Sequence, residues 1–483
     1  MSTRKSLLFS FLDRYAALAI SVVSSMFIAR LLTPDEIGVF SITMVLLMLL
    51  ASVRDMGAGQ YLVQERDLTN DRIRAVWAVQ LGVGVALACL VLLASYPVAL
   101  FYKEPRMQDI MLVVALNYAV NPFGSLTYAW LMREMRFESV ALMRFASALS
   151  GALTSIFLAW KGYGAISLAW GSLASTTVNV ATSIRFRPRS FPWLPGLREV
   201  RRVLAFGSKL SVSSIVGVAA GGAAELFLGK MQNLTAVGLY SRSNGLVLMF
   251  NRLVIDAVNA VCLPWFAKQS RESGNFVAPF LKATSYVTVL GWSFSAGIAC
   301  LAHPVVRVLY GSQWDQSVDL ARYLSLAVAF GTPASLCFMA LLATGAVTTI
   351  ARLTVLNALL TVAFTALGAS QGLVPLAYAA AASAAAGSFN GLRLTFKHLG
   401  ISWHQILSPM RISAQVSVLA AIGPVISLLL YGSYPEVYAM PLVIGGVGGL
   451  LGFVAGIFIF KHPMEEELTA VWLQIKKKAA LIF

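Results

Sequence analysis

The sequence predicts an all-α polytopic membrane protein with about fourteen transmembrane helices, and two observations predict it. The chain has 483 residues, of which 58% are hydrophobic and only 12% charged, with a mean hydropathy of +0.75. This composition is far from that of a soluble globular domain. The apolar residues also form unbroken runs of the ~20 residues that one membrane-spanning helix needs, whereas a β-barrel shows shorter alternating segments.

Hydropathy places the runs in order along the chain. The first begins within MSTRKSLLFSFLDRY, which has no small-residue cleavage site and continues into a full-length span, so we expect the N-terminus to be retained. We expect the spans at 9–32, 37–53, 75–100, 108–130, 140–160, 163–184, 205–228, 236–262, 277–301, 318–343, 351–369, 373–395, 411–431 and 437–460.

The distribution of basic residues predicts the orientation of these spans. An even number of spans places both termini on one side of the membrane. If the N-terminus is cytoplasmic, most of the 37 Lys and Arg residues fall in cytoplasmic segments. The positive-inside rule therefore predicts that both termini are cytoplasmic.

The chain contains two copies of one unit. The stretch Ala29–Gln64, ARLLTPDEIGVFSITMVLLMLLASVRDMGAGQYLVQ, recurs 200 residues later as GKMQNLTAVGLYSRSNGLVLM, so that Gly38 falls on Gly238. Further along, Asn121-Pro122 of the first copy corresponds to Thr332-Pro333 of the second. Because each copy holds an even number of spans, we expect two six-helix lobes related by a pseudo-two-fold axis along the membrane normal.

This repeat predicts the domain organisation. A basic cytoplasmic connection, RFRPRSFPWLPGLREVRR, suits anionic lipid headgroups and contains prolines that break a helix. The last segment alternates acidic, apolar and basic blocks and predicts a cytoplasmic interfacial helix. The expected parts are an N-lobe at 1–184, the linker at 185–204, a C-lobe at 205–397, two further spans at 398–460 and the tail at 461–483.

Several functional classes are excluded. A net charge of +16 and a pI near 9.9 could indicate nucleic acid, but no compact soluble region offers a basic reading face. No Walker motif, no His or Cys metal cluster and no Ser-His-Asp arrangement is present. The four cysteines are isolated in apolar runs and are expected to be buried thiols, at Cys89, Cys262, Cys300 and Cys337. We expect a transporter with no metal or cofactor, and no enzyme.

Charged residues inside the spans are the candidate site, because an intramembrane charge is expensive and by default marks function. Bases outnumber acids, and guanidinium groups bind phosphate in forked geometry. A cationic cavity for an anion is therefore predicted from Arg14, Arg54, Arg242 and Arg252. Structural readings stay open: Arg14 could pair with Asp13 or snorkel, Arg54 could anchor to lipid phosphate, and Arg252 could form an i,i+4 pair with Asp256.

Three acids are candidates for ion coupling, namely Asp13, Glu225 and Asp256. Glu225 is favoured as a protonatable gate, because it shares a face of its span with Ser214, Gly217 and Gly221, and apolar surroundings favour the neutral form of a carboxyl. Its structural alternative is a surface pair with Lys230.

One stretch of the first copy of the repeat resembles a known family of membrane proteins. The stretch ARLLTPDEIGVFSI, followed by DMGAGQYLVQ, resembles the Wzx-type polysaccharide and oligosaccharide flippases of the multidrug/oligosaccharidyl-lipid/polysaccharide exporter superfamily. The resemblance implies a protein of the bacterial inner membrane that moves undecaprenyl-pyrophosphate-linked oligosaccharides to the outer leaflet for O-antigen, capsule or exopolysaccharide synthesis. By analogy with lipid II flippases, it implies that Arg14, Arg54 and Arg252 serve the pyrophosphate. The implied partners are this anionic glycan lipid, membrane lipids and the polysaccharide polymerase machinery, and not nucleic acid.

Two rivals stay open at this point. A multidrug exporter of the same superfamily would take cationic drugs by exchange with an ion, but such proteins use embedded acids, and the basic bias argues against it. A membrane polysaccharide polymerase or ligase would have a similar hydropathy. It would carry a large outer loop, whereas the longest one expected here runs only from about Ala302 to Ser317.

Overall fold

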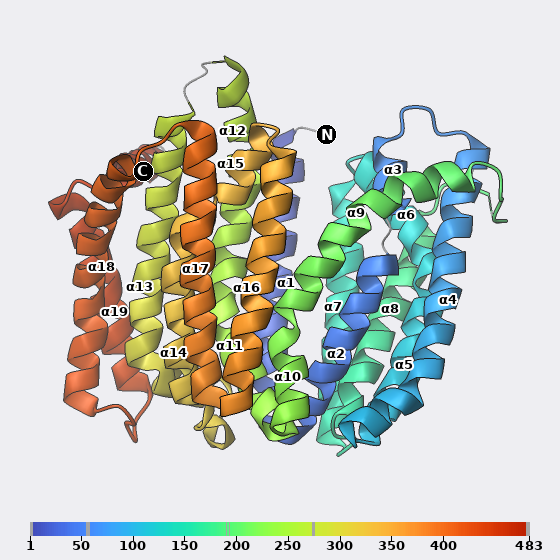
Figure 1. Ribbon diagram of the computed structural model, residues 1–483, viewed down its shortest axis with the longest axis horizontal. Helices are drawn as coiled ribbons and strands as arrows, with labels where there is room; N and C mark the ends of the chain where they lie inside the picture. Colours follow the sequence, from blue (N-terminus) through green and yellow to red (C-terminus); the bar gives the residue numbers. More distant parts are fainter. Residues whose placement is uncertain (1–2, 55–57, 190, 193, 273–275, 480–483) are drawn as a thin grey trace. The chain divides into compact units, whose positions relative to one another are not determined.

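The computed structural model describes the backbone of residues 3–54, 58–189, 191–192, 194–272 and 276–479. Side chains are described within these ranges except at 3–14, 53–54, 206–214, 272, 471 and 474–479. Within these ranges every regular element is a helix, which confirms the predicted fold class (Figure 1). Contacts divide the chain into two compact units, Met1–Gly238 and Leu239–Phe483.

Unit 1 holds ten helices and the first turn of an eleventh. Their bounds are α1 Thr3–Leu31, α2 Pro34–Arg54, α3 Ala58–Gln64, α4 Asn70–Tyr102, α5 Arg106–Val120, α6 Pro122–Arg133, α7 Phe137–Trp160, α8 Ile166–Phe186, α9 Val200–Gly221, α10 Ala223–Met231 and α11 Leu234–Phe250.

Unit 2 continues α11 and holds the remaining elements. These are the π-helical turn η1 Asn251–Ile255, α12 Asp256–Glu272, α13 Val277–Leu309, η2 Ser312–Trp314, α14 Ser317–Gly331, η3 Thr332–Ala334, α15 Cys337–Ala343, α16 Val347–Gln371, α17 Leu373–Leu399, α18 Trp403–Tyr431, α19 Ala439–Ile459 and α20 Glu465–Ala479.

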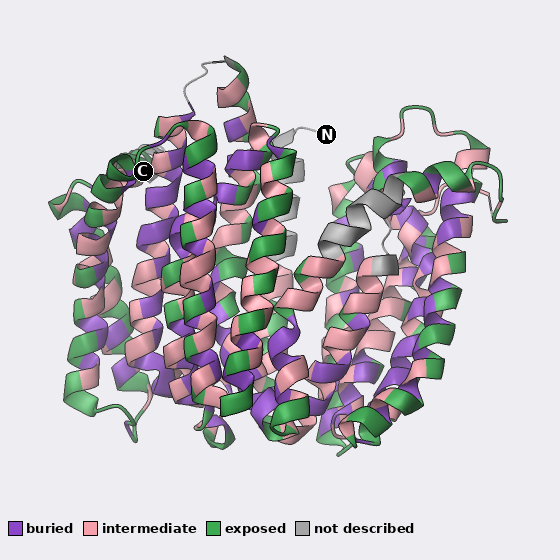
Figure 2. Cartoon of the chain, in the orientation of Figure 1, coloured by how far each residue is buried: buried purple, intermediate pink, exposed green. Residues whose placement is uncertain are grey.

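Every predicted span overlaps a helix or a broken helix. Among the described residues, nine helices are long and apolar enough to cross a membrane, or ten when α5 and α6 count as one bent span. The number fourteen stays a prediction. Along α4 the exposed side alternates with the buried side (Figure 2), and the exposed side chains include large apolar groups such as Leu93 and Phe101. Such a surface suits contact with lipid tails.

Prolines break two of the predicted spans at matching places. α5 ends before Asn121-Pro122, and α6 leaves it at an angle of 51°. In unit 2, α14 passes into the 3₁₀ turn at Thr332-Pro333. Proline lacks a backbone N–H and clashes with the preceding turn, so each span continues only as a new helix.

Helix pairing repeats from one unit to the other, which supports the duplication predicted from sequence. Within unit 1, α4 packs on α5, α5 on α8, α7 on α8, and α3 on α6. Within unit 2 the corresponding pairs are α13 with α14, α14 with α17, α16 with α17, and α12 with α15. Unit 2 adds α18 and α19, which pack closely on each other and on α13.

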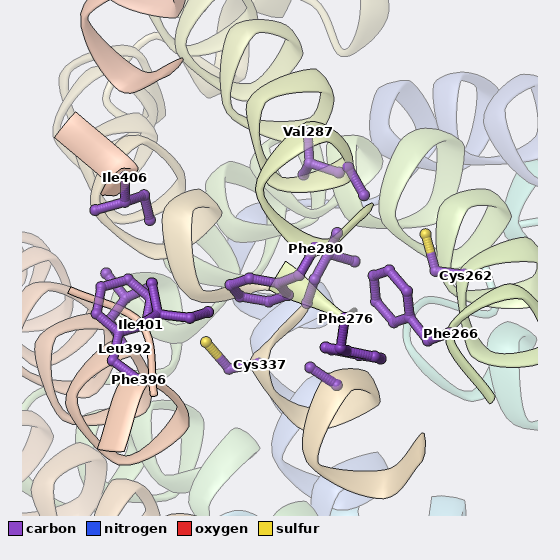
Figure 3. Close-up of a cluster of buried hydrophobic side chains, with 13 residues drawn as sticks. Cys262, Phe266, Phe276, Phe280, Val287, Cys337, Leu392, Phe396, Ile401 and Ile406 are labelled. Atoms are coloured by element: carbon purple, nitrogen blue, oxygen red, sulfur yellow. The ribbon is translucent and has the colours of Figure 1, made fainter. Parts of the chain in front are cut away.

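A core of aromatic side chains joins α12, α13, α15 and α17 in unit 2. Phe266, Phe276 and Phe280 are buried and lie together, and Phe396 and Cys337 complete the cluster from the other helices (Figure 3). Ring centroids of Phe266 and Phe276 are 5.0 Å apart, a separation at which aromatic pairs add to the stabilisation from burial.

Two further predictions have clear outcomes. The described residues between α8 and α9 are not helical, as the prolines there predicted. The prediction of buried thiols is correct for Cys262 and Cys337 and wrong for Cys89, which is exposed on α4, while Cys300 is half-buried. A thiol in an apolar helix can face lipid as well as protein, so an apolar run alone does not fix its burial.

Candidate substrate-binding site

The N-terminal members of the predicted cationic cavity lie on α1 and α2. Arg14 and Asp13 belong to α1, and Arg54 is the last residue of α2. Their side chains fall outside the part of the structure that is described. Their contribution to a cavity therefore stays a prediction.

Arg252 lies in a wide turn that the sequence did not predict. Residues Asn251–Ile255 form a π-helical turn, and the N–H of Asp256 donates to the carbonyl of Asn251, five residues earlier. A π-turn contains one extra residue, so side chains after it are displaced by about 100° relative to an uninterrupted α-helix. This widened turn lies between the α-helical residues before Arg252 and those after Asp256, and the pairing of Arg252 with Asp256 stays a prediction.

The side chains of Arg252 and Asp256 are both exposed in unit 2. Wide turns of this kind occur often at functional sites, because they redirect a side chain without ending the helix. The turn presents the Arg252 guanidinium at the surface of the helix, where an anion could reach it.

Arg242, another predicted cavity residue, lies beside two aromatic rings of unit 2. Its guanidinium carbon is 5.7 Å from the ring centroids of Tyr310 and Trp314. The next residue, Ser243, is buried and donates to the carbonyl of Ser317 at 2.9 Å. A cation held over aromatic faces is stabilised by the ring quadrupoles. This contact places Arg242 near the end of α13, and its part in a cationic cavity stays a prediction.

Glu225 lies on a different helix from the one predicted. The span breaks at Gly222, so Glu225 belongs to the short helix α10 and not to the helix of Gly217 and Gly221. Its side chain is buried, and Oε2 has no hydrogen-bond partner. Burial of a carboxylate without a partner is costly, so these surroundings favour the neutral acid.

Lys230 does not take up the surface pair proposed for Glu225. Its Nζ donates to the carbonyl of Phe101 at 2.9 Å and lies 3.9 Å from the centroid of the Phe101 ring. Five residues on a helix also place Lys230 about 140° away from Glu225. The structural alternative offered for Glu225 is therefore wrong.

Sequence reasoning missed a close approach between α2 and the segment α10–α11. A Cβ at Gly38 would lie 1.9 Å from the carbonyl oxygen of Leu234, and a Cβ at Gly238 would lie 1.8 Å from the carbonyl oxygen of Pro34. Real Cβ atoms do not come this close to another atom, so only glycine fits at either position. The signal was present, because Gly38 and Gly238 are matched residues of the repeat.

Sequence reasoning also missed most of a polar cluster in unit 2, beside the loop between α18 and α19. Arg322 pairs with Asp319 at 2.8 Å and also donates to the carbonyl of Ser433. Tyr434 donates to Asp319 at 3.0 Å, and its ring lies against the buried His303. These contacts fasten α18 and α19 to the ends of α13 and α14.

Metal chemistry receives no support from side-chain placement. Across the residues that the structure describes, no group of three or more His, Cys, Asp or Glu side chains is arranged to hold a metal ion.

Solved structures of similar fold are membrane transporters. The lipid II flippase MurJ, in an inward closed conformation, superposes with a TM-score of 0.78 at 14% identity, over 96% of this chain and 100% of that one. An inward-facing multidrug resistance transporter of the MATE family gives a TM-score of 0.61 at 14% identity, over 80% and 96% of the two chains. The chain therefore has the transporter fold that these proteins share.

Curated relatives are named for polysaccharide synthesis. A succinoglycan biosynthesis transport protein of Rhizobium meliloti is 24% identical over 68% of this chain and 66% of its own. The lipopolysaccharide biosynthesis protein WzxC of Escherichia coli is 19% identical over 64% of this chain and 63% of its own. The matched region thus spans about two thirds of the length of these relatives.

A family model settles the relationship that these partial matches indicate. The model described as "Polysaccharide biosynthesis protein" matches residues 27–319, which is more than half of the chain and includes the repeated stretch, the π-turn and Glu225. The chain belongs to this polysaccharide biosynthesis protein family.

Proposed function

We propose that this protein is a flippase for a lipid-linked anionic oligosaccharide, which it moves from the cytoplasmic to the outer leaflet by alternating access. The observation that carries the proposal is the combination of family and fold: a polysaccharide biosynthesis family on a fold shared with a lipid flippase over 96% of the chain. The paired helix packing of units 1 and 2 supports alternating access, because transporters of this kind work between repeated halves.

The cargo class follows from the basic residues of the spans. An undecaprenyl-pyrophosphate carrier has two phosphates, and Arg14, Arg54 and Arg252 are proposed to bind them through forked hydrogen bonds. Arg242 is assigned instead to its aromatic contact with Tyr310 and Trp314. The polymer made from the cargo is an O-antigen, a capsule or an exopolysaccharide, and a polymerase at the outer face would receive the unit. No catalytic step is assigned to the chain itself.

The proposed location is the bacterial inner membrane, with both termini cytoplasmic. The excess of Lys and Arg in alternate connections supports this orientation. It places the ends of α1 and α10 and the starts of α2 and α11 at the outer face. We call this end of unit 1 the distal end; it lies at the bottom of Figure 1.

Coupling to a proton gradient is proposed through Glu225. The fully enclosed Oε2 of this residue has no hydrogen-bond partner, so the closed arrangement favours a bound proton, and hydration of the site favours its release. The exchange of a proton between these two states would link an ion gradient to transport. Asp13 and Asp256 are secondary candidates for this role.

Deletion of the gene tests the cargo. Without the flippase, lipid-linked repeat units should accumulate on the cytoplasmic side, and surface polymer should disappear; complementation by the intact gene should reverse both. Normal surface polymer together with new sensitivity to cationic dyes would contradict the proposal and would favour a multidrug exporter.

A further inference from the structure

We propose that α2 and the segment α10–α11 form the outer gate of the transporter, closed by glycines that let the two backbones touch. This inference rests on the proposed function and adds to it the element that must part before the cargo leaves. We call the contact the glycine seam. It comprises Pro34, Gly38, Ile42 and Val45 of α2 and Gly222, Gly229, Leu234 and Gly238 of the opposing segment.

The residues of the seam on α2 share one face. Their spacings of four, four and three residues are those of a continuous helical stripe. Figure 1 shows α10 beside the lower part of α2, at the distal end of unit 1. The stripe therefore faces its partner over about three helical turns.

The outermost contact of the seam is between backbones. The carbonyl oxygens of Leu234 and Pro34 occupy the space that a Cβ at Gly38 and at Gly238 would need. No rotation of a side chain could relieve such a clash, because both opposing atoms belong to the main chain. The closed contact between the two backbones therefore requires glycine at both positions.

Further into the membrane, glycines of α10 accept side chains of α2. A Cβ at Gly229 would lie 2.2 Å from Cδ1 of Ile42, and a Cβ at Gly222 would lie 2.2 Å from Cγ1 of Val45. Ile42 itself is fully buried. These contacts are aliphatic and non-directional, so they can separate without leaving a buried hydrogen-bond donor or charge behind.

The outermost contact is also reciprocal. Pro34 and Gly38 meet Leu234 and Gly238, which are their own counterparts 200 residues later, and each glycine faces the carbonyl of the other copy's first helical residue. This reciprocity supports a place at which α2 and the segment α10–α11 can approach or separate, as alternating access requires.

Glu225 lies within the seam. Glu225 and Gly229 are four residues apart, so they share the face of α10 that contacts α2, and Gly222 lies directly before this helix. The charged groups of α2 nearest the distal end are Asp35, which is bound by Arg106, and Glu36. Hydration of Glu225 would therefore require the seam to part, which connects the proposed proton site to the gate.

The side chains of Arg54 on α2 and Lys209 on α9 fall outside the described residues. The described charged groups of α9, Arg201 and Arg202, lie in its first turn, and Arg202 pairs with Glu65. They are thus almost the full length of α9 away from α10.

A reversible cross-link tests the gate on one folded protein. In a background with the four native cysteines replaced by Ala, the pair Val45→Cys and Gly222→Cys is introduced. The built Cβ at 222 lies 3.2 Å from Cβ of Val45, close to the separation of about 3.5–4.5 Å in disulfides. Oxidation should reduce the rate at which cells add new surface polymer by at least about tenfold, and a reductant should restore it.

Each single-cysteine variant is the control and should be insensitive to oxidation. Undiminished polymer synthesis by the fully cross-linked protein would overturn the gate, because the seam would then never need to open.

Thiol accessibility provides a second test that does not depend on the cross-link. Ile42→Cys should react with a membrane-impermeant maleimide added from outside, because the gate exposes position 42 when it opens. Ile110→Cys on α5 is the matched control, since Ile110 is equally buried but lies outside the seam. Gly38→Ala should increase labelling of Ile42→Cys, because the added methyl group prevents closure. Equal labelling of positions 42 and 110 would overturn the proposal.

A wrong cargo and a wrong gate give different results. If deletion of the gene leaves surface polymer intact, the proposed cargo is wrong, whereas the maleimide experiment still reports whether the seam opens. If deletion abolishes polymer and position 42 stays unreactive, the cargo stands and the gate is wrong.

Discussion

Ser413 Oγ lies 3.1 Å from Nε2 of His462, and both residues are buried. The imidazole is further fixed by the N–H of Met464, which donates to Nδ1 at 3.2 Å. This contact ties the segment between α19 and α20 to α18, and burial lowers the pKa of His462 to about 4.

The His462 contact predicts a loss of stability in acid. Because the folded-state pKa lies below the ordinary value of 6.5, protonation favours the unfolded state. The stabilisation is complete above about pH 6.5 and is lost as the pH falls from there towards 4. Between pH 7.5 and pH 5 the loss should be ~2 kcal/mol. It is measured as a fall in the Tm of the purified protein, and His462→Gln should remove that part of the fall. His404→Gln, on the exposed start of α18, is the matched control. A His462→Gln protein with the full pH dependence of the original would contradict this assignment.

Replacement of Glu225 by Gln separates charge from shape. Gln has nearly the same volume but cannot release a proton, so the protein should reach normal abundance while polymer synthesis falls by about tenfold or more. The residual synthesis should not respond to external pH, whereas that of the original protein should. Wild-type synthesis by Glu225→Gln across external pH would remove this residue from the coupling mechanism.

Arg252 and Asp256 can be distinguished as substrate ligand or structural pair. Both side chains are exposed, so Arg252→Ala should change abundance little while abolishing transport. Arg252→Lys should retain part of the activity, because charge remains but the forked donor geometry is lost. The double variant Arg252→Ala with Asp256→Ala should stay abundant and inactive. Recovery of transport in that double variant would show that the arginine only balances the acid.

Arg242 should behave as a structural residue. Arg242→Gln removes a cation from beside Tyr310 and Trp314 and should cost about 1 kcal/mol of stability, seen as a lower Tm, while transport per folded molecule stays close to that of the original. Trp314→Ala should be more destabilising, by ~3–5 kcal/mol, because the indole is fully buried. An Arg242→Gln protein with an unchanged Tm and no transport would return this residue to the cationic cavity.

The helical spans could be predicted because their signal is one-dimensional. A run of apolar residues needs no knowledge of its neighbours, and Asn121-Pro122 and Thr332-Pro333 indicate their breaks directly, since proline cannot continue the hydrogen-bond pattern. The repeat was also readable from residue matches such as Gly38 with Gly238.

The site was harder to predict because its geometry depends on irregular backbone. Nothing in NRLVI distinguishes a π-turn from an α-turn, so the displacement of the residues that follow the turn could not be predicted. Gly222 ends α9, but Gly217 and Gly221 nearby were equally plausible helix residues, and Glu225 was therefore assigned to the wrong helix. The contact of Lys230 with Phe101 joins residues far apart in sequence, which spacing cannot reveal.

The π-turn at Asn251–Ile255 makes a single-residue deletion an informative mutation. The wide turn accommodates one surplus residue, so its removal would leave an ordinary α-helix that joins α11 to α12. The residues on both sides of the turn would then keep the neighbours they already have. Removal of Val254 should thus spare the packing of α12 while it tightens the turn that carries Arg252. In most helices a deletion shifts every later contact; here it would isolate the contribution of a single widened turn.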